Sequence, residues 1–240
     1  MNTLQNQNHP LIVFSLALAA ILMFGGILAL KKPTVKTQHT KQTANQAVQI
    51  TKQKETVPRE VIRAHANTDT FAYAQGPKDA SVTVVEYFDF LCPFSKQSAQ
   101  TVERLTQTYA TSSVRFVFRQ APAANVYPAS LPASNASLCA NEQGKFFPMY
   151  SLLFGQQKKI TAENFSFFAY ELGLDKSMFD ACMDSRKYQK WISKDLSDAV
   201  TLGLNGTPTW FINEKRFVGA MPFDVLSQYI QDELTSDKNN

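Results

Sequence analysis

Cys92 is the residue whose setting best suits nucleophilic chemistry. It follows a dense run of β-branched and aromatic residues at 81–90, which predicts a buried strand, and it precedes Pro93, a residue that suits the first position of a helix. Free backbone N–H groups and the positive end of the helix dipole lie at a helix start, and both favour a thiolate over a thiol. The pattern indicates a reactive cysteine, with a buried structural cysteine as the alternative.

Other kinds of catalytic site find little support in the sequence. The three histidines, His9, His39 and His65, precede the aromatic-rich part of the chain, so that part has no Cys-His or Ser-His-Asp site and no histidine-ligated metal. Neither glycine-rich nucleotide-binding motif is present. We therefore expect no metal and no cofactor.

The N-terminal part of the chain has the composition of a membrane anchor and a tether. Residues 11–30 carry no charge and, as a helix, would span about 30 Å, the thickness of a bilayer core. The tail at 1–10 lacks Lys and Arg, and "LALKKP" follows the apolar run, which favours an uncleaved anchor over a signal peptide. Residues 31–70, rich in Thr, Gln and Lys, are predicted to form a flexible polar linker.

Charge is distributed unevenly along the chain. Residues 31–70 contain eight Lys/Arg and three Asp/Glu, whereas residues 71–240 contain sixteen and seventeen. The basic surplus therefore belongs to the segment beside the predicted anchor, where it can lie against anionic lipid, and it gives no support for nucleic-acid binding by the folded part. Lysines directly after the span would, by the positive-inside rule, place the folded part in the cytoplasm.

The remaining chain alternates between strand and helix patterns. The strand at 81–90, the helix that starts at Pro93 and a strand at 113–120 make a strand–helix–strand unit with parallel pairing. Helices are predicted near 130–156, 162–172, 176–183 and 186–202, followed by strands at 207–213 and 215–219, which a tight turn at Asn213 and Glu214 joins, and by a closing amphipathic helix. This order predicts an α/β fold with a helical insertion at about 129–202. Candidate helix caps are Thr161, Asp175 and Asp184 or Ser185 at the N-terminal ends and Gly173 and Gly203 at the C-terminal ends. Trp210, just after Pro208, is predicted to lie in the core.

Four segments resemble one family when they are taken together. The stretches "VVEYFDFLCPFS", "SLCANEQGKFF", "FDACMDSRKY" and "NGTPTWFIN" are similar to the DsbA-like thiol–disulfide oxidoreductases of the thioredoxin superfamily and occur in the family's order over roughly 71–235. The resemblance implies a thioredoxin-like fold over 71–240. It also implies an extracytoplasmic domain, against the charge pattern beside the anchor, and protein thiols or disulfides as substrates.

The resemblance assigns roles to several residues. Cys92 would attack, and Pro208 would be a cis-proline facing it, with Thr207 offering backbone groups to an extended substrate strand. Glu86 matches the family's buried acid, which moves protons to or from the active-site sulfur; a solvent-exposed glutamate at the edge of a strand is the alternative. Pro93 and Phe94 complete the motif between Cys92 and position 95.

Position 95 departs from the family pattern. Members usually carry C-P-x-C, whereas this chain has C-P-F-S, and Ser95 cannot displace a thiolate to release a captured substrate. Its hydroxyl could still donate a hydrogen bond to the sulfur of Cys92. The resemblance further implies that Cys139 and Cys182 pair with each other; the alternatives are two buried reduced cysteines, or one of them acting in place of the missing cysteine.

The sequence therefore predicts a membrane-anchored protein that exchanges thiols and disulfides through Cys92 alone, in isomerase-like or thiol-capping chemistry, with a membrane redox partner as a further expectation. Two alternatives stay open. One is a redox-inactive binding or chaperone module with a thioredoxin fold. The other is an engineered cysteine-to-serine form of a C-P-F-C protein that traps mixed disulfides.

Overall fold

The computed structural model describes residue 61 and residues 73–109, 113–161 and 163–237. The predicted tail at 1–10, anchor at 11–30 and linker at 31–70 lie outside the described residues, Val61 apart. Within the described ranges, no helix combines the length and the apolar character needed to cross a membrane.

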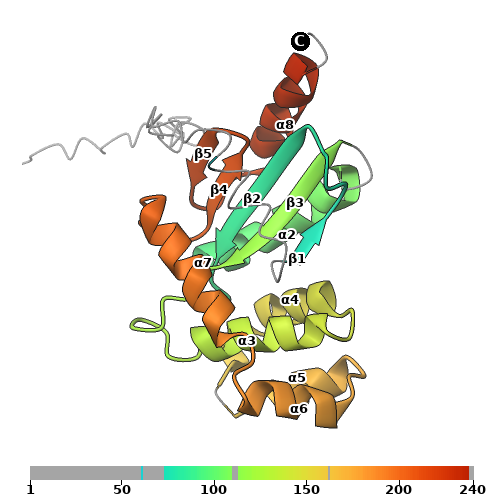
Figure 1. The fold of residues 1–240 in the computed structure, drawn as a ribbon, viewed down its shortest axis with the longest axis vertical. Helices are drawn as coiled ribbons and strands as arrows, with labels where there is room; N and C mark the ends of the chain where they lie inside the picture. Colours follow the sequence, from blue (N-terminus) through green and yellow to red (C-terminus); the bar gives the residue numbers. More distant parts are fainter. Residues whose placement is uncertain (1–60, 62–72, 110–112, 162, 238–240) are drawn as a thin grey trace, which may run out of the picture. The chain divides into compact units, whose positions relative to one another are not determined.

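A five-stranded mixed sheet forms the centre of the described part (Figure 1). The strands are β1 (Tyr73–Gln75), β2 (Val82–Phe88), β3 (Val114–Gln120), β4 (Thr209–Ile212) and β5 (Lys215–Val218). Their order across the sheet is β1-β3-β2-β4-β5, and only the β2–β3 pair is parallel. The predicted strand–helix–strand unit is thus confirmed, whereas β1 was not predicted, because so short a strand shows no clear period.

The helices occupy the predicted part of the chain, with differences in their bounds. They are α2 (Pro93–Tyr109), α3 (Ser130–Asn141), α4 (Phe146–Gly155), α5 (Phe165–Glu171), α6 (Lys176–Asp184), α7 (Gln189–Thr201) and α8 (Phe223–Asp237), with the short 3-10 helix η1 (Gln157–Lys159) after α4. In Figure 1, α2 passes behind the sheet, and α3 to α6 group together beyond the ends of β2 and β3. The described part therefore has the predicted α/β architecture with a helical insertion.

The helical segment predicted near 130–156 is in fact two helices, α3 and α4. The chain turns between them at Gly144, whose φ of 69° is a left-handed conformation that ends a helix. The backbone N–H of Lys145 donates to the carbonyl of Ala140 at 2.9 Å and closes this turn. Apolar residues at helical spacing on both sides of the glycine concealed the break.

Caps explain which helix boundaries the sequence revealed. Asp175 accepts a hydrogen bond from the backbone N–H of Met178 at 2.8 Å and caps α6, as predicted. Gly173 and Gly203 have φ of 65° just after α5 and α7, the left-handed conformation expected at a helix end. The predicted cap of α5 at Thr161 was wrong, because the N-cap residue is Asn164.

The start of α7 was also predicted too early. We expected Asp184 or Ser185 to cap it, but the structure has Tyr188 at the N-cap. Ser185 instead follows the last turn of α6, with its backbone N–H bonded to the carbonyl of Ala181 at 3.2 Å. Arg186 then turns the chain with φ of 50°, so α7 begins only after this turn is complete.

Strand β2 is buried along its whole length, because helices cover both faces of the sheet. Alternate side chains point to opposite faces, so Val84 packs in the large core with residues of α2 and α8, while Val85 and Tyr87 join a smaller cluster with Ala199 of α7. A central strand covered on both faces is usually largely apolar, and the valines and aromatic residues of this segment supply most of that surface, with Glu86 as an ionisable exception.

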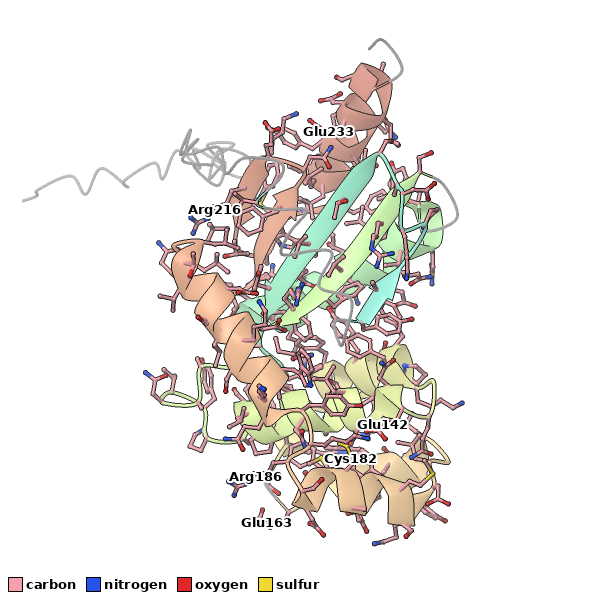
Figure 2. All side chains as sticks on the ribbon, in the orientation of Figure 1. Glu142, Glu163, Cys182, Arg186, Arg216 and Glu233 are labelled. Carbon is pink, nitrogen blue, oxygen red and sulfur yellow. A yellow bond between two sulfur atoms is a disulfide. The ribbon has the colours of Figure 1, made fainter. Side chains whose placement is uncertain are left out.

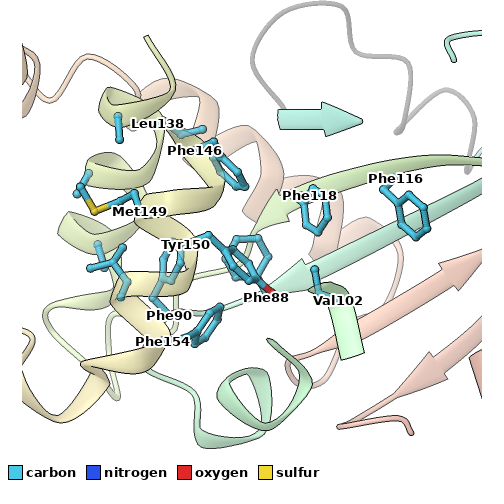
Figure 3. Packing of buried hydrophobic residues seen from close by; sticks show 14 of the residues in the cluster. Phe88, Phe90, Val102, Phe116, Phe118, Leu138, Phe146, Met149, Tyr150 and Phe154 are labelled. Carbon is cyan, nitrogen blue, oxygen red and sulfur yellow. The ribbon is translucent and has the colours of Figure 1, made fainter. Parts of the chain in front are cut away.

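An aromatic cluster joins the end of β2 to the helical insertion (Figure 3). Phe88 and Phe90 lie with ring centroids 5.0 Å apart in an edge-to-face arrangement. Phe90 also contacts Phe154 of α4 at 5.1 Å, and Tyr150 contacts Phe154 at 4.7 Å. The insertion is thus packed directly against the segment that leads to Cys92.

The edge strand β5 presents two cations. Lys215 forms an ion pair with Glu233 of α8 at 2.9 Å. Arg216 donates hydrogen bonds to the carbonyls of Leu202 and Gly203, at 3.4 and 2.8 Å, and so covers the C-terminal end of α7. Figure 2 labels Arg216 beside β5 and Glu233 on α8.

A disulfide joins Cys139 of α3 to Cys182 of α6 (Figure 2). Both cysteines are buried in the core, so neither is available as a thiol, and the alternative that one of them serves Cys92 as a resolving cysteine is wrong. Since the sequence has three cysteines, Cys92 is the single free thiol of the chain.

We predict that the double variant Cys139→Ala/Cys182→Ala loses about 4 kcal/mol of unfolding free energy. The bridge spans 43 residues, and closing a loop of that size restricts the unfolded chain by about this amount in the chain-entropy model. Chemical denaturation under non-reducing conditions measures the loss. Cys92→Ala is the control that removes a thiol without opening the bridge; an equal loss in both would contradict the prediction.

Candidate functional site

The sulfur of Cys92 faces the loop that leads into β4. Cys92 directly precedes α2, and its Sγ donates a hydrogen bond to the backbone carbonyl of Thr207 at 3.1 Å, across 115 residues of sequence. The residue is buried but not sealed in the core, since 9% of its surface is exposed. The peptide bond between Thr207 and Pro208 is cis. The structure thus brings these three predicted residues together.

Exposed neighbours surround Cys92 on the side of α2. Pro93, the first residue of the helix, is exposed, and Phe94 has 59% of its surface exposed. An incoming chain can therefore contact the ring of Phe94 directly. Both motif residues that follow Cys92 are therefore open to solvent, whereas Cys92 itself is buried.

Hydrogen bonds on both sides hold the Thr207–Pro208 loop in place. Thr209 donates its hydroxyl to the carbonyl of Gly206 at 2.7 Å, and the backbone N–H of Gly219 donates to the carbonyl of Pro208 at 2.8 Å. The indole of Trp210, predicted to be a core residue, is buried and donates to the carbonyl of Gly219 at 3.3 Å. The loop therefore presents its backbone to Cys92 from a fixed position.

A buried carboxylate organises the turn between β2 and α2. Asp89 is fully buried and accepts hydrogen bonds from three groups: the backbone N–H of Leu91 at 2.9 Å, the hydroxyl of Ser130 at 2.6 Å and the backbone N–H of Ala123 at 2.9 Å. The first contact is a local Asx turn, and the other two tie this turn to α3 and to the loop after β3. This role of Asp89 was not predicted, although an Asp directly after a strand and before a helix is a recognisable turn signal.

Ser95 lies in the first turn of α2 and is completely buried. Its Oγ accepts a hydrogen bond from the backbone N–H of Asp89 at 3.3 Å. No hydrogen bond between Ser95 and Cys92 occurs among the described residues, so the contact that we expected with the sulfur is not part of this geometry. Ser95 instead stabilises the turn that precedes the helix.

Glu86 is buried within β2, with 1% of its surface exposed. The hydroxyl of Tyr150 donates a long hydrogen bond of 3.4 Å to Oε2, and Oε1 has no hydrogen-bond partner in the described part of the chain. Burial raises the pKa of Glu86 to about 8, and the Tyr150 hydrogen bond lowers it only partly. The side chain is therefore mainly a neutral carboxylic acid at pH 7, able to give up a proton near physiological pH.

Gln157 of η1 also contacts the turn that carries Cys92. Its Nε2 donates to the carbonyl of Phe90 at 2.8 Å and to that of Cys92 at 3.0 Å. No sequence signal marks this residue, because it lies 65 residues from Cys92 and in a segment of ordinary helical composition.

The site has no features of a metal centre or a cofactor pocket. Within the described ranges, no group of three or more His, Cys, Asp or Glu side chains lies close enough to hold a metal ion. A cavity of about 570 Å³ lies in the helical insertion, lined by residues such as Leu131 of α3, Phe165 of α5 and Ile192 of α7. Cys92 does not line that cavity, so the chemistry of the sulfur belongs to the cis-proline loop and not to the cavity.

Comparison with known proteins relates this geometry to a family. Residues 67–232 match the family model described as Thioredoxin. Among curated proteins, the chain is 34% identical over 164 residues to Na(+)/H(+) antiporter NhaA 3 of Salinispora tropica, a match that covers 68% of this chain. The chain spans about a quarter of the length of that relative, 25%, so the likeness concerns one part of a longer protein.

Solved structures share the fold. A thioredoxin-like oxidoreductase from Silicibacter pomeroyi is 26% identical, with a TM-score of 0.61, and the match covers 77% of this chain and 99% of that one. The thiol-disulfide exchange protein alpha-DsbA2 from Wolbachia pipientis is 22% identical, with a TM-score of 0.64 and coverage of 72% and 94%.

We predict that Glu86→Gln stabilises the protein increasingly as the pH rises. The folded pKa of Glu86, about 8, lies above the ordinary value of 4.5, so the unfolded chain releases this proton first and the native protein loses stability between these two pH values. A glutamine cannot ionise, so the unfolding free energy of the variant does not fall in this way as the pH rises. At about 1.4 kcal/mol per pKa unit, the variant should gain about 3 kcal/mol over the wild type between pH 4 and pH 7 and level off above pH 8.

Chemical denaturation from pH 4 to 9 measures this gain. The same substitution in a Cys92→Ala background controls for titration of the thiol. A difference in stability between the wild type and the Glu86→Gln variant that stays constant with pH would show that the carboxyl ionises normally in the folded state.

We also predict that Asp89→Asn destabilises the protein by about 1–3 kcal/mol. In the wild type both side-chain oxygens of Asp89 accept hydrogen bonds. In the variant an NH₂ group replaces one of these oxygens and faces a donor with which it cannot form a hydrogen bond. Chemical denaturation at neutral pH measures the loss, with the exposed Asp79→Asn as the matched control. Equal stability of the two variants would contradict the role of Asp89 in the turn.

Proposed function

Because this chain belongs to the thioredoxin family, we propose that it exchanges thiols and disulfides in protein substrates through Cys92 alone. The observation that carries this proposal is the position of the Cys92 sulfur, 3.1 Å from the Thr207 carbonyl and next to the cis peptide bond of Pro208. The sulfur belongs to the residue that directly precedes α2, and the side chain of Phe94, two residues further along, is exposed.

The reaction begins when the thiolate of Cys92 attacks one sulfur of a substrate disulfide. The substrate S–S bond breaks as a bond between Cys92 and the substrate forms, and the displaced substrate sulfur leaves as a thiolate that takes up a proton. Glu86 supports this step as a buried acid that is mainly protonated at pH 7. Thr207 and Pro208 would align an extended substrate strand by backbone pairing, with Phe94 in contact with its side chains.

Release of the substrate needs a second thiol from outside the C-P-F-S motif. Ser95 cannot supply it, and Cys139 and Cys182 are joined to each other. A second thiolate of the substrate, or a small external thiol, attacks the substrate sulfur of the mixed disulfide and returns Cys92 as a thiolate. Attack by the substrate itself rearranges its disulfides without net oxidation, which is isomerase-like chemistry, whereas attack by a small thiol leaves the substrate joined to that thiol.

We further propose that residues 11–30 anchor the protein in a membrane, that residues 31–70 form its linker, and that the domain from 71 acts outside the cytoplasm with a membrane redox partner. The uncharged run supports the anchor. The disulfide between Cys139 and Cys182 supports an oxidising compartment, since such bonds persist there and are rare in the cytosol.

Mass spectrometry of the non-reduced protein after incubation with a scrambled disulfide-bonded protein tests this proposal. We expect a covalent adduct on Cys92, its absence in Cys92→Ala, and its decay on addition of a small thiol. In Ser95→Cys the adduct should decay at least about tenfold faster without added thiol, since the resolving attack becomes intramolecular.

Exchange activity that survives in Cys92→Ala would overturn the proposal. Binding of the scrambled protein without any adduct would instead assign the chain to the alternative class, a redox-inactive binding module.

A further inference from the structure

Gln157 connects the helical insertion to the backbone of the redox site. One nitrogen, Nε2, lies 2.8 Å from the carbonyl oxygen of Phe90 and 3.0 Å from that of Cys92. A side-chain amide has two N–H bonds, so it can serve both acceptors at once. The two carbonyls flank Leu91, and Gln157 therefore spans the turn that ends at the reactive sulfur.

The backbone of this turn makes hydrogen bonds of its own, which are separate from those that Gln157 donates. The backbone N–H of Cys92 donates to the carbonyl of Asp89 at 3.1 Å, and the carbonyl of Cys92 accepts the first helical hydrogen bond from Lys96 at 3.1 Å. Phe90 is fully buried, and a buried carbonyl needs a donor. Gln157 supplies that donor and adds a second one at Cys92.

The segment that carries Gln157 follows directly on the aromatic core. Gln157 follows α4, whose Phe154 packs on Phe90 with ring centroids 5.1 Å apart, and the backbone N–H of Ile160 donates to the carbonyl of Gln157 at 3.3 Å. The ring of Phe154 and the amide of Gln157 both contact the turn that leads to Cys92, and both residues lie at or just after the C-terminal end of α4. A side chain anchored in this way can fix the direction of the Cys92 backbone.

We infer that Gln157 is a positioning residue for Cys92: its amide holds the turn so that the sulfur faces the Thr207 carbonyl and the start of α2. This inference rests on the proposed function and adds to it a role for the helical insertion.

The pH dependence of alkylation by iodoacetamide tests the inference on the full chain. Under non-reducing conditions Cys92 is the single free thiol, so the rate reports on it alone. Gln157→Met keeps the length of the side chain and removes the amide, and Gln157→Asn keeps an amide that is one methylene too short. Gln156→Met is the matched control, since the Gln156 amide makes an exposed hydrogen bond to Glu171 at 2.9 Å.

We expect both Gln157 variants to slow adduct formation with a disulfide substrate by about three- to tenfold, the value of one ordinary hydrogen bond, and to lower the rate of alkylation over the whole pH range. Gln156→Met should leave both unchanged. Denaturation of each variant provides a separate measure of stability.

Variants of Gln157 that lose stability but keep the wild-type alkylation profile and exchange rate would overturn the inference, because the residue would then be structural only. This outcome is distinct from failure of the proposed function. In that case exchange would survive in Cys92→Ala, whatever residue occupies position 157.

Discussion

The antiparallel pairing of β2 with β4 is the constraint on which the site depends. Tyr87 lies opposite Thr209 and Glu86 opposite Trp210, so the end of one strand meets the start of the other. The chain leaving β2 reaches Cys92, and the chain entering β4 has just passed the cis peptide bond of Pro208. Residues that are 115 positions apart therefore meet because of the register of a short ladder, and the hydrogen bond between them is a consequence of it.

Much of the fold could be predicted because its signals are local. The apolar run at 81–90 indicated a buried strand, Pro93 marked the start of α2, and Asn213 takes the φ of 50° that a tight turn between β4 and β5 requires. The start of α7 could not be predicted, because the left-handed turn at Arg186 has no strong sequence signal.

The site could be predicted only in part. Cys92 and its place before a helix follow from the pattern itself, whereas the roles of Glu86, Thr207 and Pro208 came from the family resemblance. The contacts of Asp89 with Ala123 and of Gln157 with Cys92 depend on how distant segments pack. No periodicity or spacing in the sequence encodes such contacts, so they required the structure.

Two acids that are close in the sequence also differ in ways that the sequence could not predict. Glu86 has a raised pKa and an Oε1 without a hydrogen-bond partner in the described part of the chain. Asp89, in contrast, accepts three hydrogen bonds.

The cations of β5 have a consequence for the edge of the sheet. An open sheet edge can recruit any extended polypeptide and grow into an aggregate, and lysine and arginine are common means of preventing this. Here Lys215 and Arg216 occupy half of a four-residue strand and are engaged with Glu233 and with the end of α7. Both side chains therefore work against the pairing of a further extended chain along the β5 edge of the sheet.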